Sequence, residues 1–260
     1  MTLGRTGRDR RRLLFDSIDS TMDEARRRIA AGERGPLWIV ARRQTAGRGR
    51  RGRRWTSEPG NLYATLLLTD PCPPQSLGQL CIVAALALHD ALGSALPSSL
   101  ARRLRIKWPN VLLLGGAKLA GILVESAGTP SRPAEAVAIG FGVNCAHAPA
   151  DTRYRATSLA AAGHGLEPMD LFERLDRALG GRIATWDQGR GFAMLRRDWL
   201  ARAHGLGEPI AVQLGYETVE GVFAGLDPEG CLVLGRSDGT RRILPAGEVM
   251  WQRTPEAASS

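Results

Sequence analysis

The sequence has few of the residues that build metal-binding or disulfide-linked proteins. Its 260 residues include four cysteines at widely separated positions, with no Cys-x-x-Cys pair, and four equally dispersed histidines. This spacing excludes a zinc ribbon or a disulfide framework and indicates a reducing compartment, so we expect a cytoplasmic protein. No apolar run approaches the length of a membrane span, and the apolar stretch near the N-terminus is too short for the core of a secretion signal. We therefore expect no membrane association.

Acidic residues are scarce relative to basic ones. The chain has 26 Asp and Glu against 35 Lys and Arg, a net charge of +9, while hydrophobic residues make up 43%. This hydrophobic content excludes a disordered chain, and the length suffices for one substantial core and a small second domain. The positive charge predicts an anionic partner, which composition alone leaves open among nucleic acid, a phosphorylated ligand and an acidic protein surface.

What the sequence does contain is a concentration of arginine and glycine in "QTAGRGRRGRRW", residues 44–55, here called the arginine loop. It has five arginines, three glycines and no acid. Like charges on a flexible segment repel one another, so we expect this loop to be poorly ordered until an anion binds. Charge alone favours a solvated loop or a nucleic-acid patch. Because β-rich apolar stretches flank the loop on both sides, we interpret it instead as an anion-binding lid between two buried strands.

Local signals predict an α+β arrangement for most of the chain. A strand in "RLLFDSID" precedes a helix that begins after Ser20, a typical N-cap residue. Gly115 and Gly116 stand between two apolar runs, which predicts a tight hairpin. Helical periodicity returns over residues 169–204, in two segments divided by glycines.

A change in the sequence pattern after residue 205 predicts a second domain. Short β-rich stretches alternate there with turn sequences such as "DPEG" and "SDG", which is typical of a small β-barrel. We therefore place a catalytic-type domain at residues 1–205, a β-barrel domain at 206–254 and a frayed tail at 255–260.

Three further motifs place polar residues at the ends of predicted strands. "KWPN" contains Lys107 and Asn110, "AKLAGILVE" contains Lys118, and "GFGVN" ends in Asn144. Taken singly, each has an ordinary explanation: a solvated lysine at a strand end, a core tryptophan, or glycines that allow close strand packing. Only in combination with the arginine loop do these motifs indicate a ligand-binding cleft.

In this order, the motifs resemble those of the biotin protein ligases. The resemblance rests on "STM", "QTAGRGRRGRRW", "KWPN", "AKLAGILVE", "GFGVN" and the small terminal β domain, and it extends from Leu13 to Trp251. It implies an α+β catalytic domain of the class II aminoacyl-tRNA-synthetase-like type, in which helices back a mixed sheet, followed by an SH3-like barrel. It also implies the ligase-only form, because the chain is too short at its front for the N-terminal DNA-binding domain of the family's longer version.

The resemblance implies a two-step reaction. ATP activates the carboxylate of biotin to biotinyl-5′-AMP with release of pyrophosphate. Biotin then passes to a specific lysine of the biotin carboxyl carrier domain of acetyl-CoA carboxylase or another biotin-dependent carboxylase. Biotin, ATP and Mg²⁺ are the implied ligands, since cations offset the repulsion between the carboxylate and the α-phosphate. A homodimer that forms through a sheet edge is also implied.

Matching the motifs residue by residue implies a role for each polar position. The implied catalytic cations are Lys118, Arg50 and Arg48, and the counterpart of Arg50 retains the adenylate. The implied biotin-binding residues are Ser20, Thr21, Gln44, Gly47, Arg48, Lys118 and Gly121. The implied ATP- and adenylate-binding residues are Arg50, Arg51, Trp55, Asn110 and Asn144. Residues 119–123 are the implied apolar wall against the thioether ring and the valeryl chain.

Two positions depart from the family's pattern. The family reads KWPND, whereas Val111 follows KWPN here, and a valine can neither ligate magnesium nor accept a hydrogen bond. The metal ligand is therefore unknown, with Asp70, Asp90 and Glu125 as catalytic-domain carboxylates and Glu125 alone on a matched strand. Met22 stands where the family often has asparagine, a milder change because the biotin contacts belong chiefly to the two preceding positions.

Two other functions stay open. A relative that handles lipoate or octanoate has the related fold, but Ser20, Thr21 and Gln44 together with the arginine loop favour biotin. A non-catalytic protein that binds an anion or nucleic acid fits Val111 and the charge of +9. That alternative predicts salt-sensitive binding of oligonucleotides and no biotin-dependent exchange between ATP and pyrophosphate.

Overall fold

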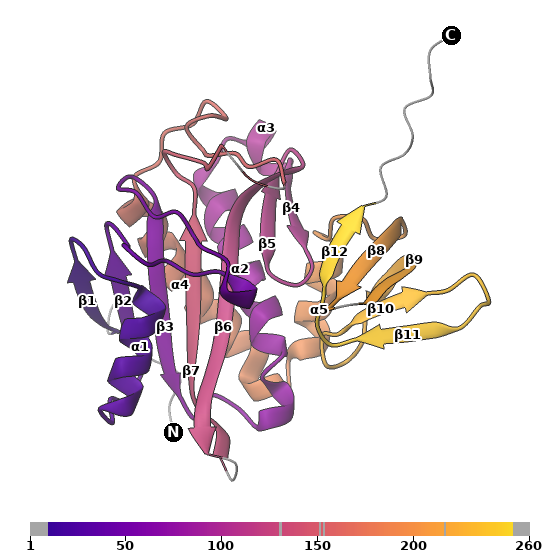
Figure 1. Ribbon diagram of the computed structural model, residues 1–260, viewed down its shortest axis with the longest axis horizontal. Helices are drawn as coiled ribbons and strands as arrows, with labels where there is room; N and C mark the ends of the chain where they lie inside the picture. Colours follow the sequence, from indigo (N-terminus) through magenta and orange to yellow (C-terminus); the bar gives the residue numbers. More distant parts are fainter. Residues whose placement is uncertain (1–9, 130–131, 151, 153, 216, 252–260) are drawn as a thin grey trace.

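The computed structural model describes residues 10–129, 132–150, 152, 154–215 and 217–251 (Figure 1). Seven strands form the larger of two sheets. They are β1 (Arg11–Phe15), β2 (Leu37–Ala41), β3 (Leu62–Thr69), β4 (Leu104–Lys107), β5 (Val111–Leu114), β6 (Ala117–Thr129) and β7 (Arg132–Val143). The order is β1-β2-β3-β7-β6-β5-β4, and the sheet is mixed because β1 runs parallel to β2 while the other neighbours are antiparallel.

Helices cover both faces of this sheet. They are α1 (Thr21–Ala30), α2 (Gln79–Ala95), α3 (Ser98–Ala101), α4 (Pro168–Trp186) and α5 (Phe192–Leu200), with single 3₁₀ turns η2 (Arg50–Gly52), η3 (Pro74–Ser76) and η4 (Asp187–Gly189). All five residues of β2 are buried. Trp38 and Val40 join the core cluster under α2 and α4, whereas Leu37 and Ile39 join the smaller cluster under α1. A strand covered on both faces reads as a continuous apolar run, which explains the composition of β2.

The local signals in the sequence form as predicted. Ser20 caps α1, because its Oγ accepts hydrogen bonds from the backbone N–H of Met22 (3.2 Å) and of Asp23 (3.4 Å). Gly115 and Gly116 connect β5 to β6 with φ angles of 58° and 80°. Glycine adopts such left-handed angles without strain, as a two-residue hairpin requires.

Five strands form the second sheet. They are β8 (Pro209–Leu214), β9 (Glu217–Leu226), β10 (Leu232–Gly235), β11 (Arg241–Leu244) and β12 (Glu248–Trp251). A mixed sheet with helices followed by a second, antiparallel sheet confirms the predicted α+β class. The predicted barrel is not closed among the described residues: the order is β11-β10-β9-β8-β12, so β11 and β12 are the two edges.

The predicted domain boundary, after residue 205, falls between α5 and β8. Residues 252–260, including the predicted tail at 255–260, lie outside the described part of the chain. Both the boundary and the tail stay predictions. Within the described ranges, no helix has the length and apolar character needed to cross a membrane.

The C-terminal sheet and its turns pack against the rest of the protein through buried aromatic residues. The indole Nε1 of Trp108 donates to the carbonyl oxygen of Gly230 (3.2 Å), and the rings of Trp199 and Phe223 meet edge to face at 6.3 Å between centroids. These contacts place the start of β12 beside the arginine loop, which runs from β2 to β3 across the large sheet (Figure 1).

Candidate active site

A cavity of about 880 Å³ lies where the arginine loop, the large sheet and the C-terminal sheet meet. Its lining comes from the start of α1, the arginine loop, strands β5, β6 and β7, residues 152, 154 and 155, and residues 247–249. Each of the five motifs found in the sequence contributes at least one lining residue. A cavity of this volume suits a small-molecule ligand.

Most of the predicted site residues line this cavity. They are Ser20, Thr21, Gln44, Arg48, Arg50, Arg51, Trp55, Asn110, Lys118 and Gly121, together with Val111. Two others, Gly47 and Asn144, do not line the cavity. Gly47 packs against the arginine loop's own residues, and Asn144 is 3% exposed and donates from Nδ2 to the carbonyl oxygen of Thr157 (3.0 Å). Asn144 thus holds the segment after β7 in place, and a nucleotide contact by it stays a prediction.

Only part of the predicted apolar wall, residues 119–123, lines the cavity. Gly121, Ile122 and Leu123 line the cavity, whereas Leu119 and Ala120 are fully buried in the main core.

The Trp55 ring packs against two glycines of strands β6 and β7, which have no side chain in its place. A Cβ on Gly142 would lie 2.6 Å from the Trp55 ring, and one on Gly121 would lie 3.0 Å from it. The close approach of the ring to β6 and β7 therefore requires glycine at both positions. The Lys118 Nζ lies 4.9 Å from the centroid of the same ring. The indole Nε1 is buried with no hydrogen-bond partner among the described residues, so a ligand acceptor would satisfy it.

A chain of hydrogen bonds fixes the polar side chains at the start of α1. The backbone N–H of Thr21 donates to Gln44 Oε1 (2.8 Å), and this assigns the amide, because a backbone N–H can only donate. The Thr21 hydroxyl donates to the same oxygen (3.1 Å) and accepts from the Thr65 hydroxyl (2.8 Å). On the other side, Gln44 Nε2 donates to Ser57 Oγ (2.9 Å), which donates to the carbonyl oxygen of Trp55 (2.9 Å).

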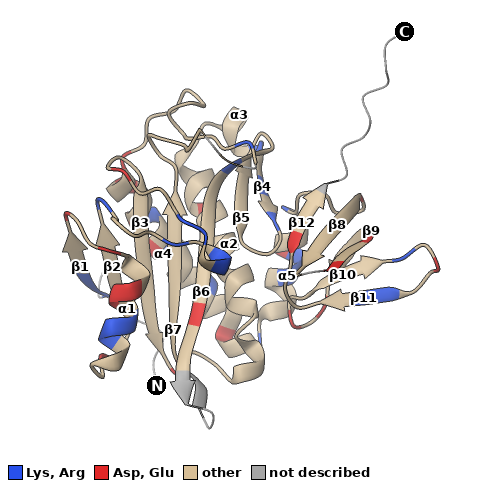
Figure 2. Ribbon diagram, viewed as in Figure 1, with Lys and Arg blue, Asp and Glu red and all other residues tan. Residues whose placement is uncertain are grey.

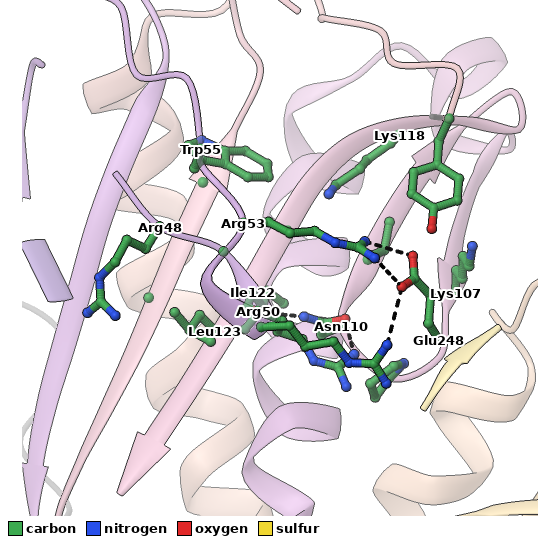
Figure 3. Close-up of a pocket in the computed structure, with 18 of the residues that line it drawn as sticks. Arg48, Arg50, Arg53, Trp55, Lys107, Asn110, Lys118, Ile122, Leu123 and Glu248 are labelled. Carbon is green, nitrogen blue, oxygen red and sulfur yellow. Dashed lines mark hydrogen bonds and ion pairs between the residues drawn. The ribbon is translucent and has the colours of Figure 1, made fainter. Parts of the chain in front are cut away.

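The arginine loop is ordered by acids that lie outside it. Arg48 pairs with Asp23 in the first turn of α1 (2.6 Å). Arg53 makes two hydrogen bonds, of 2.6 and 2.8 Å, to the carboxylate of Glu248 at the start of β12 (Figure 3). In Figure 2 the η2 turn of the arginine loop is blue and the start of β12 is red. The composition of residues 44–55 taken alone predicts disorder without an anion. The structure supplies two partners from other elements.

Unlike Arg48 and Arg53, which pair with carboxylates, Arg50 donates its hydrogen bonds to neutral oxygens. It donates to Asn110 Oδ1 and to the carbonyl oxygen of Gly247, both at 3.2 Å. The side-chain Nδ2 of Asn110 donates in turn to the carbonyl oxygen of Ile122. Burial lowers the pKa of the Arg50 guanidinium, which nevertheless stays charged at neutral pH. A partly buried cation with neutral partners is suited to binding an anion, and this role of Arg50 stays a prediction.

Both lysines of the sequence, Lys107 and Lys118, line the cavity. Burial lowers the pKa of Lys107 to about 8 and also lowers the pKa of Lys118. The Lys107 Nζ lies 5.0 Å from the centroid of the Tyr154 ring. Because burial destabilises both ammonium groups, an anionic ligand would stabilise them strongly. Sequence reasoning noted Lys107 only as a strand-end residue and did not place it in the site.

Glu248 is the one carboxylate among the described residues that line the cavity. The Arg53 guanidinium holds the pKa of Glu248 below its usual range. No group of three His, Cys, Asp or Glu residues within the described ranges could hold a metal ion. The carboxylates named from the sequence as substitutes at Val111 are engaged elsewhere: Asp70 with Arg34, Asp90 with Arg182 and Glu125 with Arg26.

Comparison with known proteins identifies the family. The sequence profile of the Biotin/lipoate A/B protein ligase family matches residues 14–144, and that of the Biotin protein ligase C terminal domain matches residues 205–250. The chain belongs to the biotin/lipoate A/B protein ligase family. This confirms the family resemblance that the motifs indicated.

Individual relatives agree over nearly the whole chain. The biotin--[acetyl-CoA-carboxylase] ligase of Paracoccus denitrificans is 44% identical over 239 residues, which cover 90% of this chain and 97% of that protein. A ligase of the same description from Mycobacterium tuberculosis is 34% identical, covering 83% and 79%. The structure of a biotin protein ligase from Aquifex aeolicus in complex with biotin and ATP has a TM-score of 0.77 at 24% identity, covering 92% and 97%, and shows that the fold is shared.

Proposed function

We propose that this protein activates biotin with ATP to biotinyl-5′-AMP and transfers biotin to a lysine of a biotin carboxyl carrier domain. Its family and the 44% identity to a biotin--[acetyl-CoA-carboxylase] ligase support this reaction. The observation that carries the choice of substrate is the set of hydrogen-bonding groups left free at the start of α1.

Counting donors and acceptors at this end of the cavity gives a defined pattern. Ser20 Oγ already accepts two backbone hydrogen bonds, so its hydroxyl proton is available to donate. Gln44 Oε1 accepts twice and one Nε2 proton is used, which leaves one N–H. Thr21 Oγ1 donates once and accepts once, which leaves one lone pair. Two donors and one acceptor remain.

This pattern is complementary to a cyclic urea. The carbonyl oxygen of a urea accepts two hydrogen bonds, and either of its N–H groups donates one. Lipoate and octanoate have neither group at the corresponding end, so they would leave buried donors unpaired. Sites built to hydrogen-bond a substrate reject analogues that lack the bonding group. The pattern therefore favours biotin over the other acids that the family name includes.

The cations of the cavity suit the chemistry of both steps. In the first, a carboxylate oxygen of biotin bonds to the α-phosphorus of ATP, and the bond to pyrophosphate breaks. In the second, the neutral amine of the carrier lysine attacks the acyl carbon and AMP leaves. Arg50 and Lys118 supply positive charge where carboxylate and phosphate must approach each other. The arginine loop can exclude water from the resulting anhydride.

Magnesium is proposed to accompany ATP. Mg²⁺ is usually held by one or two carboxylates, phosphate oxygens and water. Glu248 is the one carboxylate that the described lining offers, and Arg53 already engages it. The protein residues therefore do not form a magnesium cage by themselves, and phosphate oxygens and water would supply most of the coordination.

The partner, the compartment and the assembly are also proposals. The four cysteines are free, which suits the cytoplasm. Strand β1 is an edge of the large sheet and exposes Leu14 to 65%, which suits a homodimer formed through this edge. The net charge of +9 suits an acidic carrier domain.

The test is biotin-dependent exchange of labelled pyrophosphate into ATP, run with Mg²⁺. We expect exchange that requires biotin and that neither lipoate nor octanoate supports. If the folded protein shows no exchange and instead binds oligonucleotides in a salt-sensitive manner, the non-catalytic alternative is correct.

A further inference from the structure

We propose that Thr65 and Ser57 are positioning residues that determine specificity for the urea of biotin. They fix which atoms of Thr21 and Gln44 donate and which accept. The inference rests on the proposed function and adds two residues that do not themselves line the cavity.

The groups at the two ends of this series of hydrogen bonds determine the direction of every bond between them. The Thr21 backbone N–H must donate, so the atom facing it is Gln44 Oε1. That oxygen only accepts, so the Thr21 hydroxyl must donate to it and can only accept from Thr65. At the other end the Trp55 carbonyl only accepts, so Ser57 must donate to it and must accept from Gln44 Nε2. No alternative assignment satisfies all members.

Thr65 is present on β3 for its hydroxyl group. It is fully buried in a strand whose other residues are almost all apolar. Valine has nearly the same shape and an equal tendency to form strands, so packing alone would favour it. A buried hydroxyl is destabilising unless it is hydrogen-bonded, and the Thr65 hydroxyl donates to Thr21. Its contribution is therefore to hold the Thr21 hydroxyl proton on Gln44.

Ser57 performs the corresponding task for the amide of Gln44. The terminal torsion of a glutamine is broad, so a single contact would not fix the plane of its amide. The bonds from Thr21 to Oε1 and from Nε2 to Ser57 hold both ends of that amide. A Cβ on Gly47 would lie 2.5 Å from Ser57 Oγ and 2.9 Å from Gln44 Nε2. Gly47, within the arginine loop, thus leaves room for this arrangement.

The test removes each hydroxyl and measures affinity for biotin separately from use of ATP. Thr65→Val and Ser57→Ala delete a hydroxyl, and Thr65→Ser retains it. Thr69→Val is the matched control, because it deletes another hydrogen-bonded hydroxyl of β3, which accepts from the Gly35 N–H at a position outside the cavity lining. Isothermal titration gives Kd for biotin and for desthiobiotin, which keeps the urea without the sulfur ring. Pyrophosphate exchange gives KM for ATP.

We expect Thr65→Val and Ser57→Ala to raise Kd for both urea compounds about tenfold, because one buried partner is left unpaired. We expect KM for ATP to change by less than about twofold, Thr65→Ser to restore biotin affinity, and Thr69→Val to leave it unchanged. Unaltered biotin affinity in both deletion variants, or an equal loss for biotin and ATP, overturns the inference while the proposed function stands. Failure of the unmodified protein to bind biotin overturns both.

Discussion

In the cavity, the ammonium group of Lys118 lies beside an aromatic ring. Its Nζ lies over Trp55, and burial lowers its pKa, so an anionic ligand would stabilise its charge. We expect Lys118→Ala to lower the rate of adenylate formation on the order of 10²–10³-fold, by loss of charge stabilisation in the transition state. The unfolding temperature should stay unchanged, because no ion pair of the fold is removed.

Pyrophosphate exchange and thermal unfolding measure these two quantities. Arg236→Ala, which removes a cation from the turn after β10, is the control and should leave exchange unchanged. A normal exchange rate in Lys118→Ala would show that the site has been assigned to the wrong residues.

Val111 is the position where the cavity lacks an expected carboxylate. It pairs with Lys107 across β4 and β5 and lines the cavity. We expect Val111→Asp to raise the rate of adenylation, because the described lining otherwise offers only Glu248, which Arg53 engages. Val111→Asn is the matched control, since it has the same shape without the charge. An unchanged rate in Val111→Asp would mean that the missing carboxylate is already compensated.

The residues that sequence reasoning identified and those that it missed differ in a physical way. Lys118 and Gln44 stand in stretches whose composition is unusual by itself. Thr65 and Ser57 carry no such signal, because a hydroxyl in a strand or loop is ordinary until its partner is known. The role of Glu248 could not be identified from the sequence for another reason, because its partner Arg53 lies 195 positions away.

Among the elements, the arginine loop depends on contacts with the C-terminal sheet. Arg53 binds Glu248 with both guanidinium nitrogens, and Arg51 donates to the carbonyl oxygen of Gln213 (3.2 Å). Removing the Glu248 charge should therefore loosen the loop in the protein without ligand. We expect Glu248→Gln to speed tryptic cleavage within residues 44–55 about fivefold, which corresponds to about 1 kcal/mol for a partly exposed ion pair.

Timed digestion followed by mass spectrometry of the fragments gives this rate. Glu217→Gln is the matched control, because Glu217 pairs with Arg242 within the same sheet and away from the loop. Equal cleavage of the loop in Glu248→Gln and in the unmodified protein would contradict the proposed anchoring.

Elements with local causes were predictable, and those with distant causes were not. Ser20 caps α1 through atoms two and three residues away, and the turn at 115–116 needs only its own glycines. Whether β11 and β12 close a barrel depends on pairing between strands that a third segment separates, and turn signals say nothing about it. The sequence therefore indicated short strands correctly and their closure incorrectly for the described residues.

At the scale of the whole molecule, both sheets contribute to one site. The large sheet supplies Lys118 and Gly121, while the smaller sheet supplies Glu248 and the adjoining carbonyl oxygen that receives Arg50. The fold therefore couples the orientation of the C-terminal sheet to the order of the loop that covers the ligand.

The distribution of amines leads to a further prediction. The 260-residue sequence contains two lysines, both in the cavity, and 33 arginines. An acyl-adenylate reacts with neutral amines, whereas a guanidinium stays protonated and does not compete. We expect synthetic biotinyl-5′-AMP to leave the outer side chains of this protein unlabelled while it labels a lysine-rich bystander in the same tube. Arg236→Lys should acquire biotin at position 236, as peptide mass spectrometry would show, and equal labelling of both proteins' surfaces would contradict the expectation.

The near absence of lysine would thus act as a form of chemical self-protection. Molecules of the activated intermediate that escape the cavity meet a surface of arginine, which they cannot acylate. An enzyme built in this way would tolerate some escape of its activated intermediate without being gradually inactivated by it.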